Sequence, residues 1–506
     1  FNLIFHIMQK KIIILILLFT SYSFVLYSNS PESDANTMNR HFNGPLKTNP
    51  NNPNYFIDNS GKAKYLTGSH TWANFQEIGI DTTKRFDYEN YLKMMEECHH
   101  NFMRLWMFEN SAFASWTPDT IFWHPNIYQR SGKGKAGDGG TKFDLTRFNQ
   151  YYFDRLRQRI IQAGNRGIYV SVMLFQGWSL DKTGISDPWR AHPWNKNNNI
   201  NGIGARDSVA DNNSLATIHS MRNPKLLEIQ EQYIKKVIET VNDLDNVLYE
   251  VSNEGGDHDW QEWVINLIRE YEKSKNKQHA IGYTTPSQLG HLNKNLYESS
   301  ADWVSPTMEP LRWAYPGTKY MENYMDDPPA NKFGKINILD TDHLWGHGGN
   351  WKWVWKSFTR GYNPIFMDPW QPIEYHSDER VSWVFTGGVS KDNRDYPDWH
   401  FVRTNMGYAR KIADSVNLID LFPEPDIAST GYCLTDKKNV FIVYLPNGGD
   451  VTINMLSCDI NANYYIEWFF PILNRSMKIN TPVKGGGYKN FTLPFTGDGV
   501  LILIKN

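Results

Sequence analysis

Two adjacent polar residues, Asn253 and Glu254, follow a short apolar run at 246–252 and precede two glycines. Such a run predicts a buried strand, and barrel enzymes place catalytic groups at the carboxyl ends of parallel strands. A carboxyl group there can be half of the acid/base pair that hydrolyses glycosides, and the neighbouring amide can hydrogen-bond a sugar hydroxyl. Because an Asn-Glu pair is also an ordinary loop sequence, the prediction depends on a second carboxylate nearby.

The segment 335–345 offers that second carboxylate, since an apolar run there ends in Asp340, Asp342 and His343. Retaining hydrolysis needs a nucleophile about 5 Å from the acid/base. Asp340 and Asp342 would point to the same side if the strand continued through them, so one is expected as nucleophile and the other as its support. A capping aspartate, a surface loop and the metal-binding Asp-x-Asp pair of nucleotide-sugar transferases are the alternatives. No nucleotide-binding segment accompanies the last of these.

Strand-like and helix-like patterns alternate over residues 54–418, which predicts an α/β fold with parallel strands and crossover helices. The eight predicted strands are 64–68, 101–108, 167–175, 246–252, 279–284, 302–305, 335–339 and 363–367, and the predicted helices include 88–99, 147–166, 225–241, 260–273 and 399–416. Eight such strands suit a closed (β/α)₈ barrel. A doubly wound open sheet is the alternative, but no glycine-rich phosphate loop follows any strand.

Two long insertions, 110–141 and 177–222, interrupt the barrel pattern and are rich in tryptophan, glycine and asparagine. Loops of this length are usually functional or disordered, and disordered segments are poor in aromatic residues. The insertions therefore favour a binding surface, with packing of the loops themselves as the alternative for each ring. The aromatic residues in question are Trp116, Trp123, Trp178, Trp189 and Trp194.

Residues 419–506 have a different pattern, of short alternating strands at 439–445, 451–454, 464–470 and 500–504 separated by Gly, Asn and Pro. This pattern predicts a small β-sandwich. Such a domain could bind a glycan or could brace the barrel. Residues 31–53 form a polar linker before the barrel.

The first thirty residues have the order of a secretory signal: Lys10 and Lys11, an apolar run at 12–18, and the small residues Ser28 to Ser30. Met8 is the expected start, which makes residues 1–7 upstream sequence. Cleavage after this signal predicts a secreted or periplasmic protein without stable membrane insertion, and an uncleaved amino-terminal anchor is the alternative.

The 52 basic and 54 acidic residues nearly balance, which argues against nucleic acid as a partner. Three cysteines are too few for a disulfide framework, although Cys433 and Cys458 could pair within the terminal domain. Cys98 is expected to be a small core residue. No cysteine and histidine spacing resembles a zinc site, and no metal or other cofactor is implied.

Four segments together resemble the apiosidase-like glycoside hydrolases: Tyr55 to Gly61, Tyr65 to Trp72, Asn101 to Trp106 and Tyr249 to Gly256. The family consists of retaining barrels whose acid/base and nucleophile follow strands four and seven. Many members carry a terminal β-domain labelled as collagen-binding, which residues 419–506 resemble. The resemblance thus covers nearly all of the chain after the signal.

The resemblance implies that Glu254 is the acid/base, that Asn253 contacts the sugar beside the scissile bond, and that Arg104 supports the nucleophile. Asp342 lies where the related enzymes place the nucleophile, but there the residue is usually glutamate. Because aspartate is shorter, a retaining mechanism requires the backbone at 342 to lie closer to the substrate. If the gap between the two carboxyls is instead wide enough to hold a water, the enzyme would invert configuration.

Other polar and aromatic residues fall where a barrel opens its mouth, and each is expected either to contact substrate or to support the rim. These residues are His70, Trp72, Gln176, Trp178, Glu309, Asp368 and Trp370, together with Asp340 and His343.

The sequence therefore predicts a secreted glycoside hydrolase that acts on plant or algal cell-wall carbohydrate, is exo-acting and retains configuration. A carbohydrate-binding or adhesion protein on a barrel that has lost turnover is the competing hypothesis, and the aspartate at position 342 is its main support. Protease activity or collagen binding has little support, because no metalloprotease helix motif or serine or cysteine triad is evident.

Overall fold

The computed structural model describes residues 42–80, 85–181, 184–205, 218–284, 293–309, 322–346, 349–368, 370 and 399–506. The predicted signal lies outside these residues, as do residues 31–41 of the predicted linker. Among the described residues, no helix is both long and apolar enough to cross a membrane.

Eight parallel strands form the barrel, in the order β3-β14-β13-β12-β11-β10-β9-β5. Their bounds are β3 Gly68–His70, β5 Phe102–Leu105, β9 Tyr169–Gln176, β10 Val247–Asn253, β11 Ile281–Thr284, β12 Trp303–Ser305, β13 Ile336–Asp340 and β14 Asn363–Met367. The sheet closes where the Thr67 carbonyl accepts hydrogen bonds from the backbone N–H groups of Asn101 (3.0 Å) and Phe102 (3.2 Å). The predicted (β/α)₈ barrel is therefore confirmed.

The first barrel strand starts later than predicted. Lys64 belongs instead to a short antiparallel hairpin of β1 (Phe56–Ile57) and β2 (Ala63–Lys64), which turns at Gly61 with a φ of 75°. That left-handed conformation suits glycine, so the turn reverses the chain before the barrel begins.

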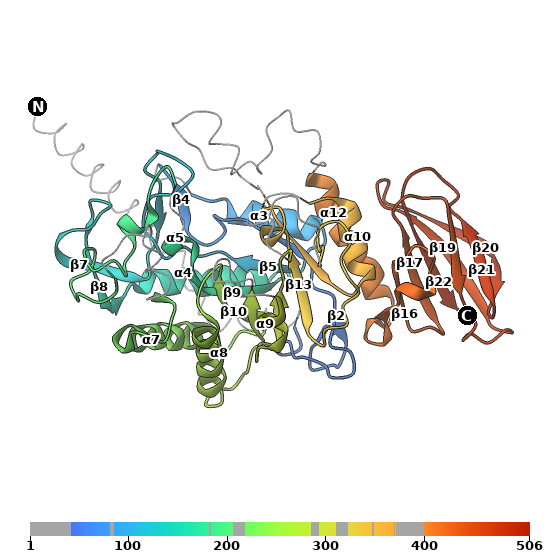
Figure 1. Cartoon of the computed structure of the whole chain (residues 1–506), viewed down its shortest axis with the longest axis horizontal. Helices are drawn as coiled ribbons and strands as arrows, with labels where there is room; N and C mark the ends of the chain where they lie inside the picture. The colour runs from blue at the N-terminus through green and yellow to red at the C-terminus, as the bar shows by residue number, and fades with distance from the viewer. Residues whose placement is uncertain are drawn as a thin grey trace, which may run out of the picture.

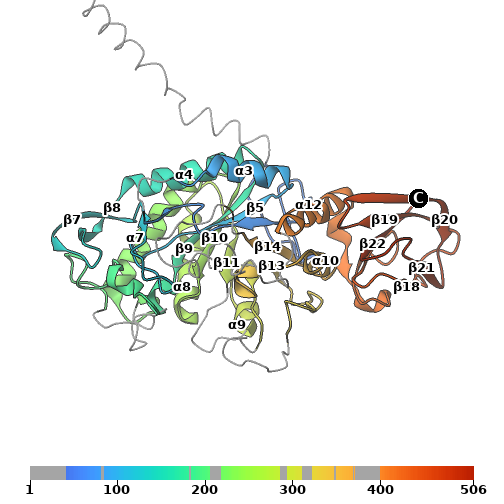
Figure 2. The same cartoon turned by 90° about the horizontal axis from the view of Figure 1, so that it is seen from above.

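Helices cover the outside of the barrel (Figures 1 and 2). They are α3 Tyr88–Glu97, α4 Gln150–Gly164, α7 Pro224–Val241, α8 His258–Glu272, α9 Asn293–Glu298, α10 Trp351–Thr359 and α12 Trp399–Ser415. Side chains that precede α3, α7 and α8 cap the first turn: Asp87, Asn223 and Asp257 each accept a hydrogen bond from a backbone N–H of that turn. Every residue of β9 and β10 is buried, because these strands lie between the barrel interior and the helices.

The two insertions contain regular structure that the sequence pattern did not predict. In the first, β6 (Phe122–His124) pairs with β4 (Glu77–Gly79), and β7 (Tyr128–Lys135) forms a hairpin with β8 (Thr141–Phe148), which begins at the last residue of the insertion. Trp123, Trp189 and Trp194 are buried in the core, which agrees with the packing alternative. Trp116 and Trp178 are only partly buried and face the barrel mouth.

The terminal domain is built of two antiparallel sheets. The larger has the order β15-β16-β17-β22-β19-β20 and the smaller pairs β18 with β21. Their bounds are β15 Phe422–Pro423, β16 Cys433–Thr435, β17 Val440–Leu445, β18 Asp450–Asn454, β19 Asn463–Phe470, β20 Arg475–Lys484, β21 Tyr488–Thr492 and β22 Gly499–Lys505. The predicted β-domain is confirmed, whereas β15, β16, β20 and β21 were missed.

The terminal domain packs against α10 and α12 at one side of the barrel (Figures 1 and 2). Trp355 of α10 lies 5.4 Å from the Phe469 ring and 6.4 Å from the Tyr444 ring, measured between ring centroids. Barrel and terminal residues thus share one hydrophobic core. The suggested Cys433–Cys458 disulfide is wrong, because both cysteines are free thiols. Cys98 is a half-buried free thiol at the end of α3.

Candidate active site

The turn after β10 holds Glu254 in a backbone conformation that is rare for a residue with a side chain. Its φ is 51°, in the left-handed region, so the turn is strained at the residue that carries the carboxylate. Gly177 and Gly255 pack back to back beside it: a Cβ on Gly177 would lie 2.3 Å from the Glu254 carbonyl oxygen. The backbone N–H of Gly177 also donates to the Asn253 carbonyl (2.8 Å). Close packing of two glycines therefore fixes where Glu254 emerges.

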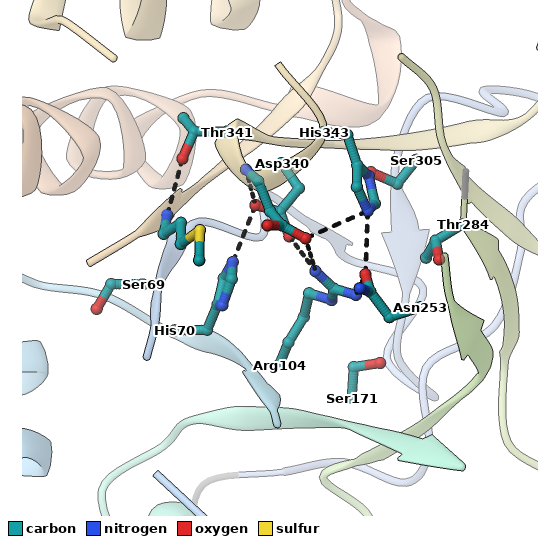
Figure 3. Close-up of polar contacts among 12 residues, drawn as sticks. Ser69, His70, Arg104, Ser171, Asn253, Thr284, Ser305, Asp340, Thr341 and His343 are labelled. Atoms are coloured by element: carbon teal, nitrogen blue, oxygen red, sulfur yellow. Dashed lines mark hydrogen bonds and ion pairs between the residues drawn. The ribbon is translucent and has the colours of Figure 1, made fainter. Parts of the chain in front are cut away.

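Arg104, at the end of β5, is buried at the centre of a charged network (Figure 3). Its Nε and Nη2 donate to the two carboxylate oxygens of Glu250 (2.9 and 2.5 Å), and its Nη1 donates to Asp340 (2.6 Å). Nη2 also donates to the Asn253 Oδ1 (2.6 Å). Burial opposes the charge on Arg104, but the Glu250 and Asp340 carboxylates raise its pKa further above the ordinary value. The guanidinium therefore ties together the ends of three strands.

Asp340 is fully buried and is held by two partners. Its Oδ1 lies 2.9 Å from His70 Nε2, and its Oδ2 accepts from Arg104. Burial by itself would raise the pKa of Asp340, but the charges of His70 and Arg104 outweigh burial and hold it below the ordinary value. Asp340 is therefore an ionised supporting group beneath the cavity.

Asp342 lies beyond the end of the strand, so the expected alternation does not apply to it, although its carboxyl and that of Asp340 both lie near Arg104 Nη1 (3.7 and 2.6 Å). β13 ends at Asp340, whose side chain accepts from the Asp342 backbone N–H (2.9 Å) and so caps a 3₁₀ turn over Thr341–His343. The turn directs the Asp342 carboxyl to the cavity, 3.7 Å from Arg104 Nη1. Burial raises its pKa well above the ordinary value, and the negative charges of Asp340 and Glu254 add to this.

His343 fixes the orientation of the Asn253 amide. His343 Nδ1 lies 3.0 Å from the Ser305 hydroxyl and Nε2 lies 3.2 Å from Asn253 Oδ1 (Figure 3). Burial lowers the pKa of His343 to about 3, so the ring is neutral. Because Asn253 Oδ1 only accepts, Nε2 carries the proton and Ser305 donates to Nδ1. Arg104 and His343 thus both donate to Oδ1, which leaves the Asn253 NH₂ group to donate into the cavity that it lines.

A small cavity of about 30 Å³ lies at the carboxyl ends of the barrel strands. Glu254, Asp342, Asn253 and Gln176 supply its polar lining. Gln176 Oε1 accepts from the Ser179 hydroxyl (3.0 Å), while its buried Nε2 has no hydrogen-bond partner among the described residues. The aromatic lining consists of Trp72, Trp106, Phe108, Trp116 and Trp178. These rings are in mutual contact, with centroids of Trp116 and Trp178 at 4.7 Å.

The structure thus brings Glu254, Asp342, Asn253, Gln176, Trp72 and Trp178 to one cavity, and places Arg104, Asp340, His70 and His343 in contact with them or with one another. The remaining three predicted residues are outside this lining. Glu309 accepts from the Asn293 backbone N–H (3.1 Å), and Asp368 pairs with Arg403 of α12 (2.7 Å). Trp370 lies near the same arginine and near α3. This placement favours rim support for them.

Three residues of the site were missed by the sequence analysis: Glu250, Trp106 and Phe108. Glu250 could have been noticed as the one charged residue in an otherwise uncharged strand, since a buried charge needs a partner. Trp106 and Phe108 were assigned to the predicted strand 101–108, whereas β5 ends at Leu105 and both rings line the cavity. Within the described residues, no group of three His, Cys, Asp or Glu side chains is arranged to bind a metal ion.

Comparison with known proteins bears on the fold. A family model described as a domain of unknown function (DUF6298) matches residues 111–292, which include all but the first residue of the two insertions and also include Glu254. A search among curated proteins finds no match. The chain is similar to a solved structure of a candidate glycoside hydrolase from Bacteroides vulgatus ATCC 8482, with 13% identity, a TM-score of 0.60, and coverage of 92% of this chain and 83% of that one.

A glycoside hydrolase of family 5 from the same organism gives 14% identity, a TM-score of 0.57, and coverage of 91% and 94%. A third solved structure, a glycoside hydrolase, gives 12% identity, a TM-score of 0.51, and coverage of 91% and 97%. These similarities show a shared fold over most of the chain.

Proposed function

We propose that this protein is a secreted glycoside hydrolase that retains configuration, with Glu254 as acid/base and Asp342 as nucleophile. The observation that carries the proposal is that two carboxyl groups from the ends of β10 and β13 line one cavity walled by tryptophans. Carboxyl pairs at strand ends of a barrel are the apparatus of glycoside hydrolysis. Aromatic faces suit the apolar faces of sugar rings.

In the first step, Glu254 donates its proton to the glycosidic oxygen while the Asp342 carboxylate attacks the anomeric carbon. The bond from that carbon to the leaving oxygen breaks, and a glycosyl ester on Asp342 forms. In the second step, the Glu254 carboxylate takes a proton from water, whose oxygen attacks the same carbon and releases Asp342. The Asn253 NH₂ group, oriented by Arg104 and His343, would donate to a sugar hydroxyl throughout.

The charges around Asp342 bear on its role. A nucleophile must be ionised, yet burial and the negative charges of Asp340 and Glu254 raise the pKa of Asp342. The mechanism needs a charge on Asp342 and a proton on Glu254, beside the leaving oxygen. Arg104 at 3.7 Å stabilises Asp342 once it ionises.

The substrate class follows from the resemblance and from the wall of the cavity. The apiosidase-like family suggests a terminal sugar, a branched-chain sugar among them, on a plant or algal cell-wall polysaccharide. The contacting rings of Trp72, Trp116 and Trp178 give one side of the cavity a continuous wall, which supports exo action. The signal-like first thirty residues support secretion.

The competing function is glycan binding without turnover. One observation favours it: the short contact of Arg104 is with Asp340 (2.6 Å), whereas Asp342, the assigned nucleophile, is 3.7 Å away. A binding protein would hold the same sugars in this cavity and form no covalent adduct.

A screen of residues 31–506 against plant and algal oligosaccharides tests the proposal, with Glu254→Gln and Asp342→Asn as matched variants. Sugar release by the parent that both substitutions abolish would support the assigned pair. Activity retained in Asp342→Asn would make Asp340 the candidate nucleophile. Binding without release from any glycan would favour the non-catalytic function.

A further inference from the structure

Glu109, in the loop after β5, does not line the cavity but joins three segments around it. The residue is buried, and its Oε1 accepts from the Gln176 backbone N–H (2.9 Å) and lies 3.1 Å from His219 Nε2. Its Oε2 accepts from Trp194 Nε1 (2.9 Å). A single carboxylate therefore connects the end of β9 with two described parts of the second insertion, 184–205 and 218–222.

His219 is fully buried and forms one side of the turn that carries Glu254. Its ring stacks on Trp260 at 4.5 Å with an angle of 16° between the planes. Its carbonyl accepts from the Asp257 N–H (3.1 Å), and a Cβ on Gly255 would lie 3.0 Å from its Nδ1. Gly255 directly follows Glu254, so a shift of the His219 ring would alter the space that the turn occupies.

We propose that Glu109 and His219 are a positioning pair that holds the Glu254 turn in its strained conformation. The inference rests on the proposed role of Glu254 as acid/base. The pair acts on two groups of the cavity at once, because Glu109 also holds the backbone of Gln176 and Gln176 is followed by Gly177, which packs on Gly255. The second insertion thereby becomes part of the catalytic apparatus through residues that are not at the cavity surface.

A second buried Glu–His pair provides a matched control. Glu272 Oε1 lies 2.8 Å from His279 Nδ1, and its Oε2 accepts from the His279 N–H (2.8 Å). This pair lies at the carboxyl end of α8 and precedes β11, at the opposite end of the barrel from the cavity. Both pairs are buried carboxylate–imidazole contacts, but only the first touches the catalytic turn.

The experiment compares Glu109→Gln and His219→Phe with Glu272→Gln and His279→Phe in the full chain. Melting temperature, kcat and KM on the sugar that the parent hydrolyses, and amide hydrogen exchange of residues 253–261 are measured for each. All four variants should melt below the parent. The two variants near the cavity should lose roughly tenfold to a hundredfold in kcat, because a small displacement of a catalytic group is enough for that, with KM within about twofold. Their exchange at 253–261 should be faster, whereas the control variants should keep the kcat and exchange of the parent there.

Equal losses of kcat in all four variants, or parent-like exchange at 253–261 in Glu109→Gln and His219→Phe, would overturn the inference. Should His219→Phe fail to fold, Glu109→Gln decides, since it is isosteric and keeps an acceptor for Gln176. Should the parent hydrolyse no glycan, the proposed function fails separately, and the exchange data alone support or overturn the positioning role.

Discussion

Two regions of this barrel are built from opposite kinds of contact. At the carboxyl ends of the strands, Arg104 is surrounded by the carboxylates of Glu250, Asp340 and Asp342, all withdrawn from water. At the junction with the terminal domain, Trp355 packs among aromatic rings in a core shared by both parts. Buried charges are costly unless paired, whereas buried rings stabilise directly. The difference indicates that the first region is arranged for chemistry and the second for stability.

Glu254→Gln should give the largest loss of activity with the least loss of stability. Removing the acid/base should lower kcat by roughly 10²–10⁴-fold, the usual contribution of a general acid or base. The melting temperature should stay close to that of the parent, because glutamine has the same shape and the strained backbone at 254 is kept. Calorimetry beside a sugar-release assay measures both. A variant that loses its fold along with its activity would show that Glu254 is structural.

Arg104→Met should lower both stability and activity. The substitution leaves Glu250 and Asp340 buried without their cation, and breaking such a pair costs about 3–5 kcal/mol. Sugar release should fall too, because Asn253 loses a donor that orients its amide. Denaturant unfolding gives the free energy.

Arg403→Met is the matched control for Arg104→Met, since Arg403 also pairs with a strand-end aspartate, Asp368. It should lower stability and leave kcat unchanged. A large loss of kcat in Arg403→Met would instead indicate that Asp368 contacts the substrate.

Trp355→Ala tests the aromatic junction between the barrel and the terminal domain. Removing a fully buried tryptophan from the shared core should cost about 3 kcal/mol or more, and should also leave Asn405 without its indole donor. Below the melting temperature, kcat per folded molecule should equal that of the parent. Unfolding followed by two probes, one in each domain, should show one transition, and two separate transitions would mean that the domains do not depend on each other.

The smallest effects should appear in stability against pH for Asp340→Asn and Asp342→Asn. The pKa of Asp340 is lowered in the folded state, so its charge stabilises the fold above its ordinary pKa of 3.8, and this is lost as pH falls toward the folded value. The pKa of Asp342 is raised, so its ionisation opposes folding as pH rises above 3.8.

Asp342→Asn should therefore melt above the parent at about pH 7, with the difference vanishing near pH 4, whereas Asp340→Asn should melt below the parent at about pH 7. Melting curves over this range measure both. The same sign of change in the two variants at neutral pH would contradict the opposite environments of the two carboxyls.

The sequence was informative where a strand ends in a polar residue. Apolar runs before Asn253 and Asp340 marked both strand ends, and the structure places their side chains at one end of the barrel. It was less informative where a partner is distant in the chain. Asp368 looks like a rim residue until Arg403 is seen to pair with it, and Glu250 draws no attention without Arg104.

The backbone conformation just after a strand could also not be predicted from the pattern of residue types. Alternation predicted that Asp340 and Asp342 share a side if the strand continued through both, but the strand ends at Asp340, whose side chain caps a tight turn that carries Asp342 to the cavity. The left-handed backbone of Glu254 was similarly invisible, since two glycines beside it carry the close packing and neither reveals the conformation of its neighbour.

The aromatic wall gives this protein an optical reporter of its own. Trp72, Trp106, Trp116 and Trp178 line the cavity, so a molecule that enters it replaces water next to several indole rings and should shift their fluorescence emission. An unlabelled sugar could then be titrated directly against the native protein, even one that is bound and never cleaved. Trp116→Phe, which keeps an aromatic face, would show how much of the signal comes from the cavity and how much from tryptophans buried elsewhere.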